Sequence, residues 1–230
     1  YVQQGIRQAG GTPVEFGVIA ACDGIAQGHE GMHYILPTRD LIANDIELMV
    51  QAHRLDAVVF LGYCEKIVPA MLMAAARLDL PAIMVVGGPM EGGCRFDGRS
   101  SDITSVMEGL GMLKTGKIDE AAHVALENCA GPTCGSCSFL GTANTMCCVA
   151  EAMGLSLPGS ATIPATYADR LRVAQASGRQ IVALVKAGIT ARKILNQKGI
   201  ENGIRLSTAI GGSTNVALHI PAIGYEADCE

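Results

Sequence analysis

The residues DAVVFLGYCEKIVPAMLMAAARLDLPAIMVVGG, 56–88, give the strongest indication of the fold class. Its two ends, residues 56–64 and 81–88, are apolar runs rich in β-branched residues, which is typical of buried β-strands. Residues 69–80 between them are rich in Ala, Leu and Met, which favour helix. A strand, a helix and a second fully apolar strand in this order predict a βαβ unit with parallel strands.

The rest of the chain extends this alternation. Residues 14–22, VEFGVIAAC, predict a further strand, and residues 36–55 carry apolar side chains at helical spacing. The second half is mainly helical, with helices expected at 101–116, 119–129 and 139–154. We therefore expect an α/β fold, a three-layer α/β/α domain with a mainly parallel sheet.

Composition limits the classes of function. The chain has 230 residues, of which 49% are hydrophobic and 17% charged, as in a globular protein. The net charge of −5 and an aromatic content of 4% without Trp argue against a nucleic-acid partner. The apolar runs fall well short of the ~18 residues of a membrane-spanning helix, so we expect no membrane association.

The two ends of the sequence indicate that residues 1–230 are part of a longer chain. The chain begins at Tyr1 rather than Met, inside the helix-like stretch YVQQGIRQAGG, and it ends just after another helical stretch. We expect residues 1–230 to be a single α/β/α domain that is truncated at both ends and belongs to a longer protein.

Nine cysteines are a high count for this length. A disulfide framework suits a shorter, loop-rich secreted chain, so we expect a reducing cytoplasm with some cysteines bound to metal. Cys147 and Cys148 are adjacent within a predicted helix and cannot share one face. We expect both to pack as small hydrophobic side chains.

Polar residues follow each predicted strand. Asp23 follows the first, Cys64, Glu65 and Lys66 follow the second, and Gly87-Gly88-Pro89 follows the third. The carboxyl ends of parallel strands meet at one edge of a sheet, where ligands bind. The carboxylates suit Mg²⁺, although Asp23 could instead only stabilise a turn, and Lys66 could be an ion-pair partner or a carbamate that supplies a further oxygen.

The CxxC pair Cys134 and Cys137 allows several interpretations. A redox dithiol usually follows a strand, whereas this pair follows a Gly-Pro loop. Structural zinc needs four ligands, and a second CxxC or HxxxH pair is missing. An iron–sulfur cluster shared with Cys64 remains, favoured by the N-terminal charge of the helix expected at 139–154. The motif GGSTN, residues 211–215, could bind an anion at a helix N-terminus or form a glycine turn.

Six motifs occur in an order that resembles the dihydroxy-acid dehydratase and 6-phosphogluconate dehydratase family. They are ACDGIAQGHEGM, CEKIVPAMLMAA, GGPMEGG, GPTCGSCSFLGTANTM, SLPGSATIPA and AIGGSTN, and they cover nearly the whole chain. The resemblance implies a hydro-lyase that converts a 2,3-dihydroxy acid to a 2-keto acid with an iron–sulfur cluster beside Mg²⁺. It also implies an N-terminal α/β/α domain and a C-terminal β-barrel-like domain that residues 1–230 lack.

The resemblance also assigns residues by position. Cys64 and Cys137 match the ligands of a 2Fe-2S or 4Fe-4S cluster, while Asp23, Glu65 and Lys66 fall where the family binds Mg²⁺. Lys66, carbamylated in some members, is the candidate catalytic residue.

Two points in this assignment stay open. The family usually has Asp where this chain has Glu65, which is one methylene longer. Some members take a third cluster cysteine from upstream of the matched region, and Cys134 or Cys22 are the alternatives within this chain.

The family contains more than one activity. GPTCGSCS and SLPGSATIP favour dihydroxy-acid dehydratase of branched-chain (isoleucine and valine) biosynthesis, with a sugar-acid dehydratase as the alternative. An alternative of another class is a non-catalytic metal-binding fragment. The family's base and a further carboxylate ligand come from the C-terminal domain, so we expect this chain alone to be inactive. The resemblance further implies a homodimer for the full-length protein.

Overall fold

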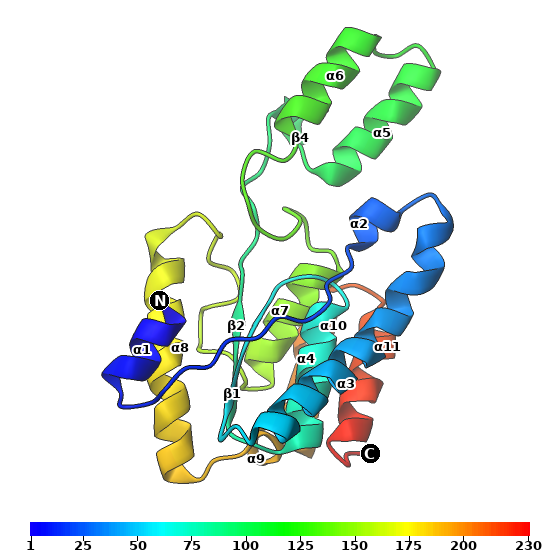
Figure 1. Ribbon diagram of the computed structural model, residues 1–230. Helices are drawn as coiled ribbons and strands as arrows, with labels where there is room; N and C mark the ends of the chain where they lie inside the picture. The colour runs from blue at the N-terminus through cyan, green and yellow to red at the C-terminus, as the bar shows by residue number, and fades with distance from the viewer.

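The centre of the fold is a pair of parallel strands joined by a buried helix (Figure 1). The computed structural model describes all 230 residues. Strand β1 (Val58–Gly62) pairs with β2 (Ala82–Val86) over their full lengths. Helix α4 (Ile67–Leu78) connects them, and every residue in it except Arg77 is buried. The βαβ unit predicted from residues 56–88 is therefore confirmed.

Helices cover both faces of this pair (Figure 1). On one face, α8 (Ala168–Ala187) packs against the strands and α1 (Val2–Gln8) packs on α8. On the other face, α4 packs against α3 (Ile35–His53), α7 (Thr142–Ala152) and α11 (Val216–Glu226). The arrangement is the predicted α/β/α class, although its parallel sheet has only two strands.

The remaining elements complete the chain. They are α2 (Asp23–Ala26), the 3₁₀ helix η1 (Glu30–Tyr34), β3 (Arg95–Phe96), β4 (Arg99–Ser100), α5 (Ile103–Lys114), α6 (Glu120–Cys129), α9 (Ala191–Ile194) and α10 (Gln197–Ala209). None of the helices combines the length and the apolar character that spanning a membrane requires.

One part of the chain projects from this body. The β3–β4 hairpin and helices α5 and α6 extend away from the parallel strands (Figure 1). Cys94, before β3, forms a disulfide with Cys129 at the end of α6, with 5.6 Å between their Cα atoms. The expectation that the cysteines are reduced or bound to metal is therefore wrong for this pair. Their separation of 35 residues gave no sign that the two approach each other.

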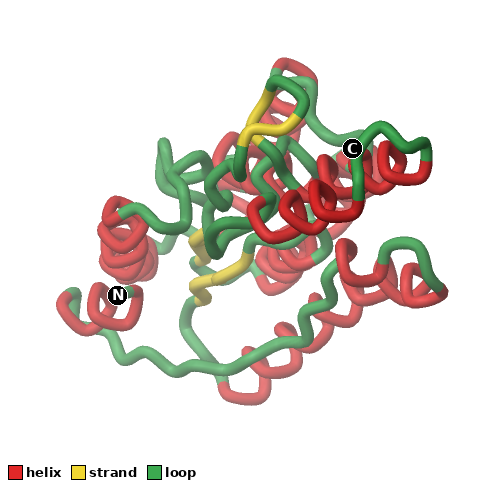
Figure 2. Tube along the Cα trace, turned by 90° about the horizontal axis from the view of Figure 1, so that it is seen from above, coloured by secondary structure: helices red, strands yellow, loops and turns green.

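The prediction of a strand at residues 14–22 is correct for the extended backbone and wrong for its pairing in a sheet. The segment runs extended between α1 and α2 (Figure 2). Its partly buried Phe16 and Val18 pack against the main core, while Glu15, Gly17 and Ile19 are exposed. This alternation is that of a strand. However, residues 12–21 form no backbone–backbone hydrogen bond, and a strand without a paired neighbour is not part of a sheet.

Arg170, on α8, holds the loop of residues 155–165 against the sheet. Its guanidinium donates to the carbonyl of Val86 at 2.8 Å, to that of Ser160 at 2.7 Å and to that of Ile163. Arg170 is 6% exposed, so these carbonyls have little access to water as replacement partners. A single side chain thus joins α8, the end of β2 and this loop.

We expect Arg170→Leu to lower the free energy of unfolding by roughly 3 kcal/mol, because it removes charged hydrogen bonds and leaves buried carbonyls unpaired. Arg172→Leu is the matched control on the same helix, since the Arg172 side chain is 71% exposed and pairs only with Asp169. It should change stability by less than about 0.5 kcal/mol. Urea unfolding followed by circular dichroism measures both, and equal losses would contradict this role of Arg170.

Candidate functional site

Lys66 joins two carboxylates at the end of β1. It lies directly before α4 and is 6% exposed. Its Nζ donates to Asp23 Oδ2 at 3.1 Å and to Glu65 Oε1 at 2.5 Å. A buried ammonium is stable only when it is paired. The structure thus brings together Asp23, which follows the first predicted strand, and Glu65 and Lys66, which follow the second, as predicted.

Glu65 has a second partner in the GGSTN motif. Asn215 Nδ2 donates to Glu65 Oε1 at 2.8 Å and to Thr142 Oγ1 at 2.9 Å. Thr142 Oγ1 in turn lies 2.7 Å from Ser213 Oγ. Burial raises the pKa of Glu65, and the hydrogen bond from Lys66 opposes this rise. The motif therefore approaches the carboxylates through an amide side chain.

Asp23 supplies an oxygen that has no partner. It begins α2, and its Oδ2 accepts the hydrogen bond from Lys66. Its Oδ1 is buried and receives no hydrogen bond. Burying a carboxylate oxygen without a donor or a cation is costly. This oxygen is suited to a cation ligand, and the donor set fits a hard ion such as Mg²⁺.

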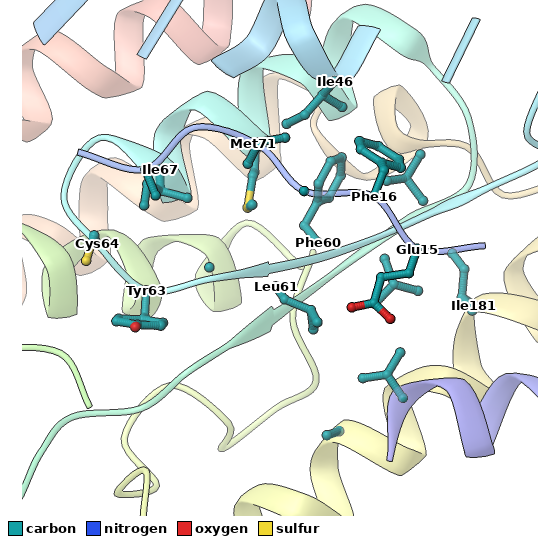
Figure 3. A pocket seen from close by; sticks show the side chains of 18 of the residues that line it. Glu15, Phe16, Ile46, Phe60, Leu61, Tyr63, Cys64, Ile67, Met71 and Ile181 are labelled. Carbon is teal, nitrogen blue, oxygen red and sulfur yellow. The ribbon is translucent and has the colours of Figure 1, made fainter. Parts of the chain in front are cut away.

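Three thiols line the same cavity as these carboxylates. Cys22, Cys64 and Cys137 belong to the wall of a cavity of about 1720 Å³ that Asp23 and Glu65 also line. Figure 3 shows Cys64 just beyond the end of β1, next to Tyr63 and Ile67. Cys134 is exposed and lies outside the cavity wall.

The thiols are in a partly desolvated, negative environment. Burial raises the pKa of Cys64 to about 11, with contributions from Cys22, Cys137, Asp23 and Glu65. Burial and Cys22 also raise the pKa of Cys137. Both thiols are therefore protonated at neutral pH in the protein without metal. Binding a metal to them requires the release of protons.

The loop that carries Cys137 is fixed to the exit of β2. Ser136 donates its N–H to the carbonyl of Gly88 at 2.9 Å, and its carbonyl accepts from the N–H of Met90 at 2.9 Å. Gly135 has φ +135°, and a Cβ there would lie 2.4 Å from the Met90 nitrogen. Only glycine permits this close approach. The residues that follow β2 thus hold the loop that carries the Cys137 thiol.

Asn144 holds the other side of the same loop. Its Nδ2 donates to the carbonyls of Cys137 at 2.6 Å and Phe139 at 2.7 Å. Its Oδ1 accepts from Ser136 Oγ at 2.6 Å. Nothing in the sequence distinguishes Asn144 from an ordinary helix residue. The one available signal was that an amide in the first turn of a helix often caps a preceding loop.

The expected start of the helix after Cys137 is wrong. Helix α7 begins at Thr142, so Cys137 lies in the preceding loop, outside the first turn where the helix N-terminal charge acts. Asn144 donates to the carbonyls of Cys137 and Phe139, which therefore have partners although they lie outside the helix. Cys147 belongs to the main core and is 1% exposed, and the partly buried Cys148 packs against that core. Both pack as hydrophobic side chains, as predicted.

The carboxylates and thiols do not form a closed metal site. No three side chains of His, Cys, Asp or Glu lie close enough together to hold an ion. The Lys66 ammonium lies between the two carboxylates and supplies the positive charge there. A divalent cation at this place needs Lys66 to move or to lose its charge. The ligand roles of Asp23, Glu65, Lys66, Cys64 and Cys137 therefore stay predictions.

His219 is a further buried residue near the carboxylates that the sequence did not indicate. It lies on α11 with no exposed surface, its Nδ1 is 3.4 Å from Arg39 Nη1, and its Nε2 has no partner. Burial and the positive charges of Lys66 and Arg39 lower the pKa of His219 to about 4. The imidazole is thus neutral at pH 7, beside the carboxylate cluster. A single His in the apolar run VALHIPAIG gave no ligand spacing that could have revealed it.

We expect Asn144→Ala to increase the rate at which iodoacetamide alkylates Cys137 by roughly tenfold, the effect of about 1.4 kcal/mol of lost loop ordering. The change removes the hydrogen bonds that fix the loop. Asn202→Ala is the control, because Asn202 is exposed on α10 and contacts only Arg205. Mass spectrometry of the labelled chain gives both rates. An unchanged Cys137 rate in Asn144→Ala would contradict the anchoring role.

Comparison with known proteins agrees with the motifs at this site. Residues 1–230 match the family described as dihydroxy-acid/6-phosphogluconate dehydratase N-terminal. The chain is 53% identical over 229 residues to dihydroxy-acid dehydratase 1 of Methanosarcina acetivorans, covering 100% of this chain and 41% of that protein.

Two further relatives give the same result. The dihydroxy-acid dehydratase of Methanoregula boonei is 54% identical over 227 residues, which are 99% of this chain and 41% of that protein. The dihydroxy-acid dehydratase of Caldanaerobacter subterraneus subsp. tengcongensis is 54% identical over 226 residues, 98% of this chain and 40% of that protein. The chain thus spans about two fifths of the length of these relatives. It belongs to the dihydroxy-acid/6-phosphogluconate dehydratase family and matches the N-terminal part of that family's proteins.

Proposed function

We propose that this chain is the N-terminal α/β/α domain of a dihydroxy-acid dehydratase, a hydro-lyase that converts a 2,3-dihydroxy carboxylic acid to a 2-keto acid. The observation that carries the proposal is that Asp23 and Glu65, which Lys66 joins, line one cavity together with the thiols of Cys64 and Cys137. Oxygen ligands select a hard cation and thiolates select iron, so the two chemistries lie side by side.

The donor groups support a resident Mg²⁺ and an iron–sulfur cluster. Asp23 Oδ1 is buried without a partner, and Glu65 accepts hydrogen bonds only through Oε1, so each carboxylate has an oxygen left for a cation. Cys64 and Cys137 would hold iron. When bound, the two metals supply Lewis acidity for the departing 3-hydroxyl and for the substrate's carboxylate and 2-hydroxyl.

The residues of this chain have separate tasks in that reaction. Lys66 and Asn215 fix the orientation of the Glu65 carboxylate, and Asn144 fixes the loop of Cys137. Conversion of Lys66 to a carbamate would replace a positive charge between two carboxylates by an oxygen ligand.

The names of the relatives support one substrate class. The three compared proteins are named dihydroxy-acid dehydratase, and this favours a branched-chain 2,3-dihydroxy acid over a phosphorylated sugar acid. A place in isoleucine and valine biosynthesis, a cytoplasmic location and a homodimer of the full-length protein belong to the same proposal. The remaining catalytic groups would come from the part of the protein that corresponds to the other three fifths of the relatives' length.

We expect a chimera in which residues 1–230 replace the matching part of the Methanosarcina acetivorans protein to form 2-keto acid from 2,3-dihydroxyisovalerate. The chain alone should show no turnover, because it spans only 41% of that relative. Asp23→Asn should lower kcat by about 100-fold or more, since it weakens a hard-cation ligand. Asp40→Asn, at an exposed side chain of α3, is the control.

The assay also separates the rival functions. Turnover of gluconate-type acids with no turnover of 2,3-dihydroxyisovalerate would favour a sugar-acid dehydratase. A reconstituted chimera that binds metal tightly and is inactive on both substrates would favour the non-catalytic alternative.

We expect Cys64→Ser and Cys137→Ser in the chimera to abolish the visible charge-transfer absorbance of the cluster together with the activity, because serine is a poor iron ligand in place of a thiolate. Cys134→Ser should retain both, since Cys134 is exposed and lies outside the cavity wall. Absorption spectra and iron content measure the result. Bleaching by Cys134→Ser with an intact spectrum in Cys137→Ser would reverse the assignment within the CxxC pair.

A further inference from the structure

Strand β1 has a neighbour on one side only. It pairs with β2, and no other strand joins this sheet. The N–H of Val58 donates to Pro81 at 3.0 Å, and the carbonyl of Gly62 accepts from Gly87 at 3.3 Å. Backbone groups alternate in direction along a parallel strand. Those of Val59 and Leu61 therefore point away from β2, and they form no backbone hydrogen bond.

A second open backbone edge faces β1. Residues 13–21 run extended and make no backbone–backbone hydrogen bond at any position. Their downstream end is held at the end of β1, because Lys66 bonds Asp23. The segment and β1 thus run in the same direction. They present two rows of unpaired N–H and C=O groups that each need a partner.

The space between the two edges is an open cavity. Both the segment and β1 line it, and its volume is about 1720 Å³, above the roughly 300–1,000 Å³ of small-molecule sites. Figure 3 shows Phe16 on the segment and Phe60 and Leu61 on β1 within this cavity, and Figure 2 shows the segment apart from the strands. No backbone–backbone hydrogen bond joins residues 13–21 to β1, so the two edges do not pair directly.

The walls above and below the cavity are apolar. Ile46 of α3 and Met71 of α4 line one wall, and Ile181 and Val182 of α8 line the other. Leu61 is 59% exposed, although it belongs to the central sheet of an α/β/α fold. Strands inside such a sheet are buried on both faces. The cavity thus offers hydrogen-bonding partners at its sides and apolar surface on both faces.

We propose that one β-strand from the part of the protein outside residues 1–230 binds in this cavity. A strand of about five residues, apolar on both faces, would match β1 in length and would pair with β1 on one side and with residues 13–21 on the other. The relatives have the chain length to supply it, since this chain covers only 40–41% of theirs. Neither a small molecule nor a helix satisfies two parallel backbone edges.

Filling the cavity would affect the candidate metal centre directly. The open edges end at Asp23 and at Cys64, so the inserted strand would fix the distance between the magnesium and iron ligands. The sheet would then contain at least four neighbouring strands in place of two. This inference concerns the backbone and does not depend on which acid is dehydrated.

Hydrogen exchange resolved to single amides tests the proposal in the chain alone and in the Methanosarcina chimera. In the chain alone, the amides of Val59, Leu61 and residues 14–21 should exchange as unpaired groups. In the chimera, the amides of Val59, Leu61 and every second residue of 14–21 should exchange roughly 100-fold more slowly or better, because their N–H groups then face the inserted strand. The amide of Val58, bonded to Pro81, should be protected in both and reports that β1–β2 is folded. Unprotected Val59 and Leu61 in a chimera with protected Val58 would overturn the proposal.

A pair of variants makes the test specific. Leu61→Lys should leave Val58 protection in the chain alone unchanged and should abolish Val59 protection in the chimera, because a charge would enter the filled cavity. Leu48→Lys, at a residue 70% exposed on α3, should change neither. Protection of Val59 in the chain alone that rises with protein concentration would show a second copy in the cavity and would overturn the commitment to a strand from the rest of the protein.

Discussion

The buried ammonium of Lys66 is the charge on which the arrangement of the site depends. It has almost no contact with water, so it must keep the carboxylates of Asp23 and Glu65 beside it. These contacts tie the segment before α2 to the end of β1, although residues 12–21 make no backbone bond to the sheet. Asn215 then connects Glu65 to the start of α11. Three distant parts of the chain meet because one charge requires partners.

The parallel sheet explains why this charge lies where it does. Parallel strands connected by a buried helix place their carboxyl ends at one edge. Cys64, Glu65 and Lys66 follow β1 at that edge, and the exit of β2 fixes the loop of Cys137 through Ser136. Thiols and carboxylates therefore line the same cavity at this edge. Glu65, one methylene longer than the family's usual aspartate, uses one oxygen for both Lys66 and Asn215.

The unpaired edge of β1 borders the large cavity beside the two-stranded sheet. An α/β/α layer buries strands on both faces, yet β1 leaves Leu61 exposed and one edge unpaired. The helices α3, α4 and α8 nevertheless stand far enough apart to enclose more than these strands. Helices line both sides of the cavity, and no strand pairs with the open edge of β1. The candidate metal centre lies at the rim of this opening.

The βαβ unit, the α/β/α class and the residues at the strand ends are predictable from the sequence alone, because apolar runs and helical spacing are local properties of residues 56–88. The sequence motifs also identified the family. The folded chain was needed to see that Lys66 bridges Asp23 and Glu65, that Asn144 anchors the Cys137 loop, and that His219 lies buried nearby. These contacts join residues far apart in the chain, and no local pattern encodes them. The strand predicted at 14–22 shows the same limit, because alternation makes a segment extended, whereas a sheet requires a neighbour whose backbone accepts its hydrogen bonds.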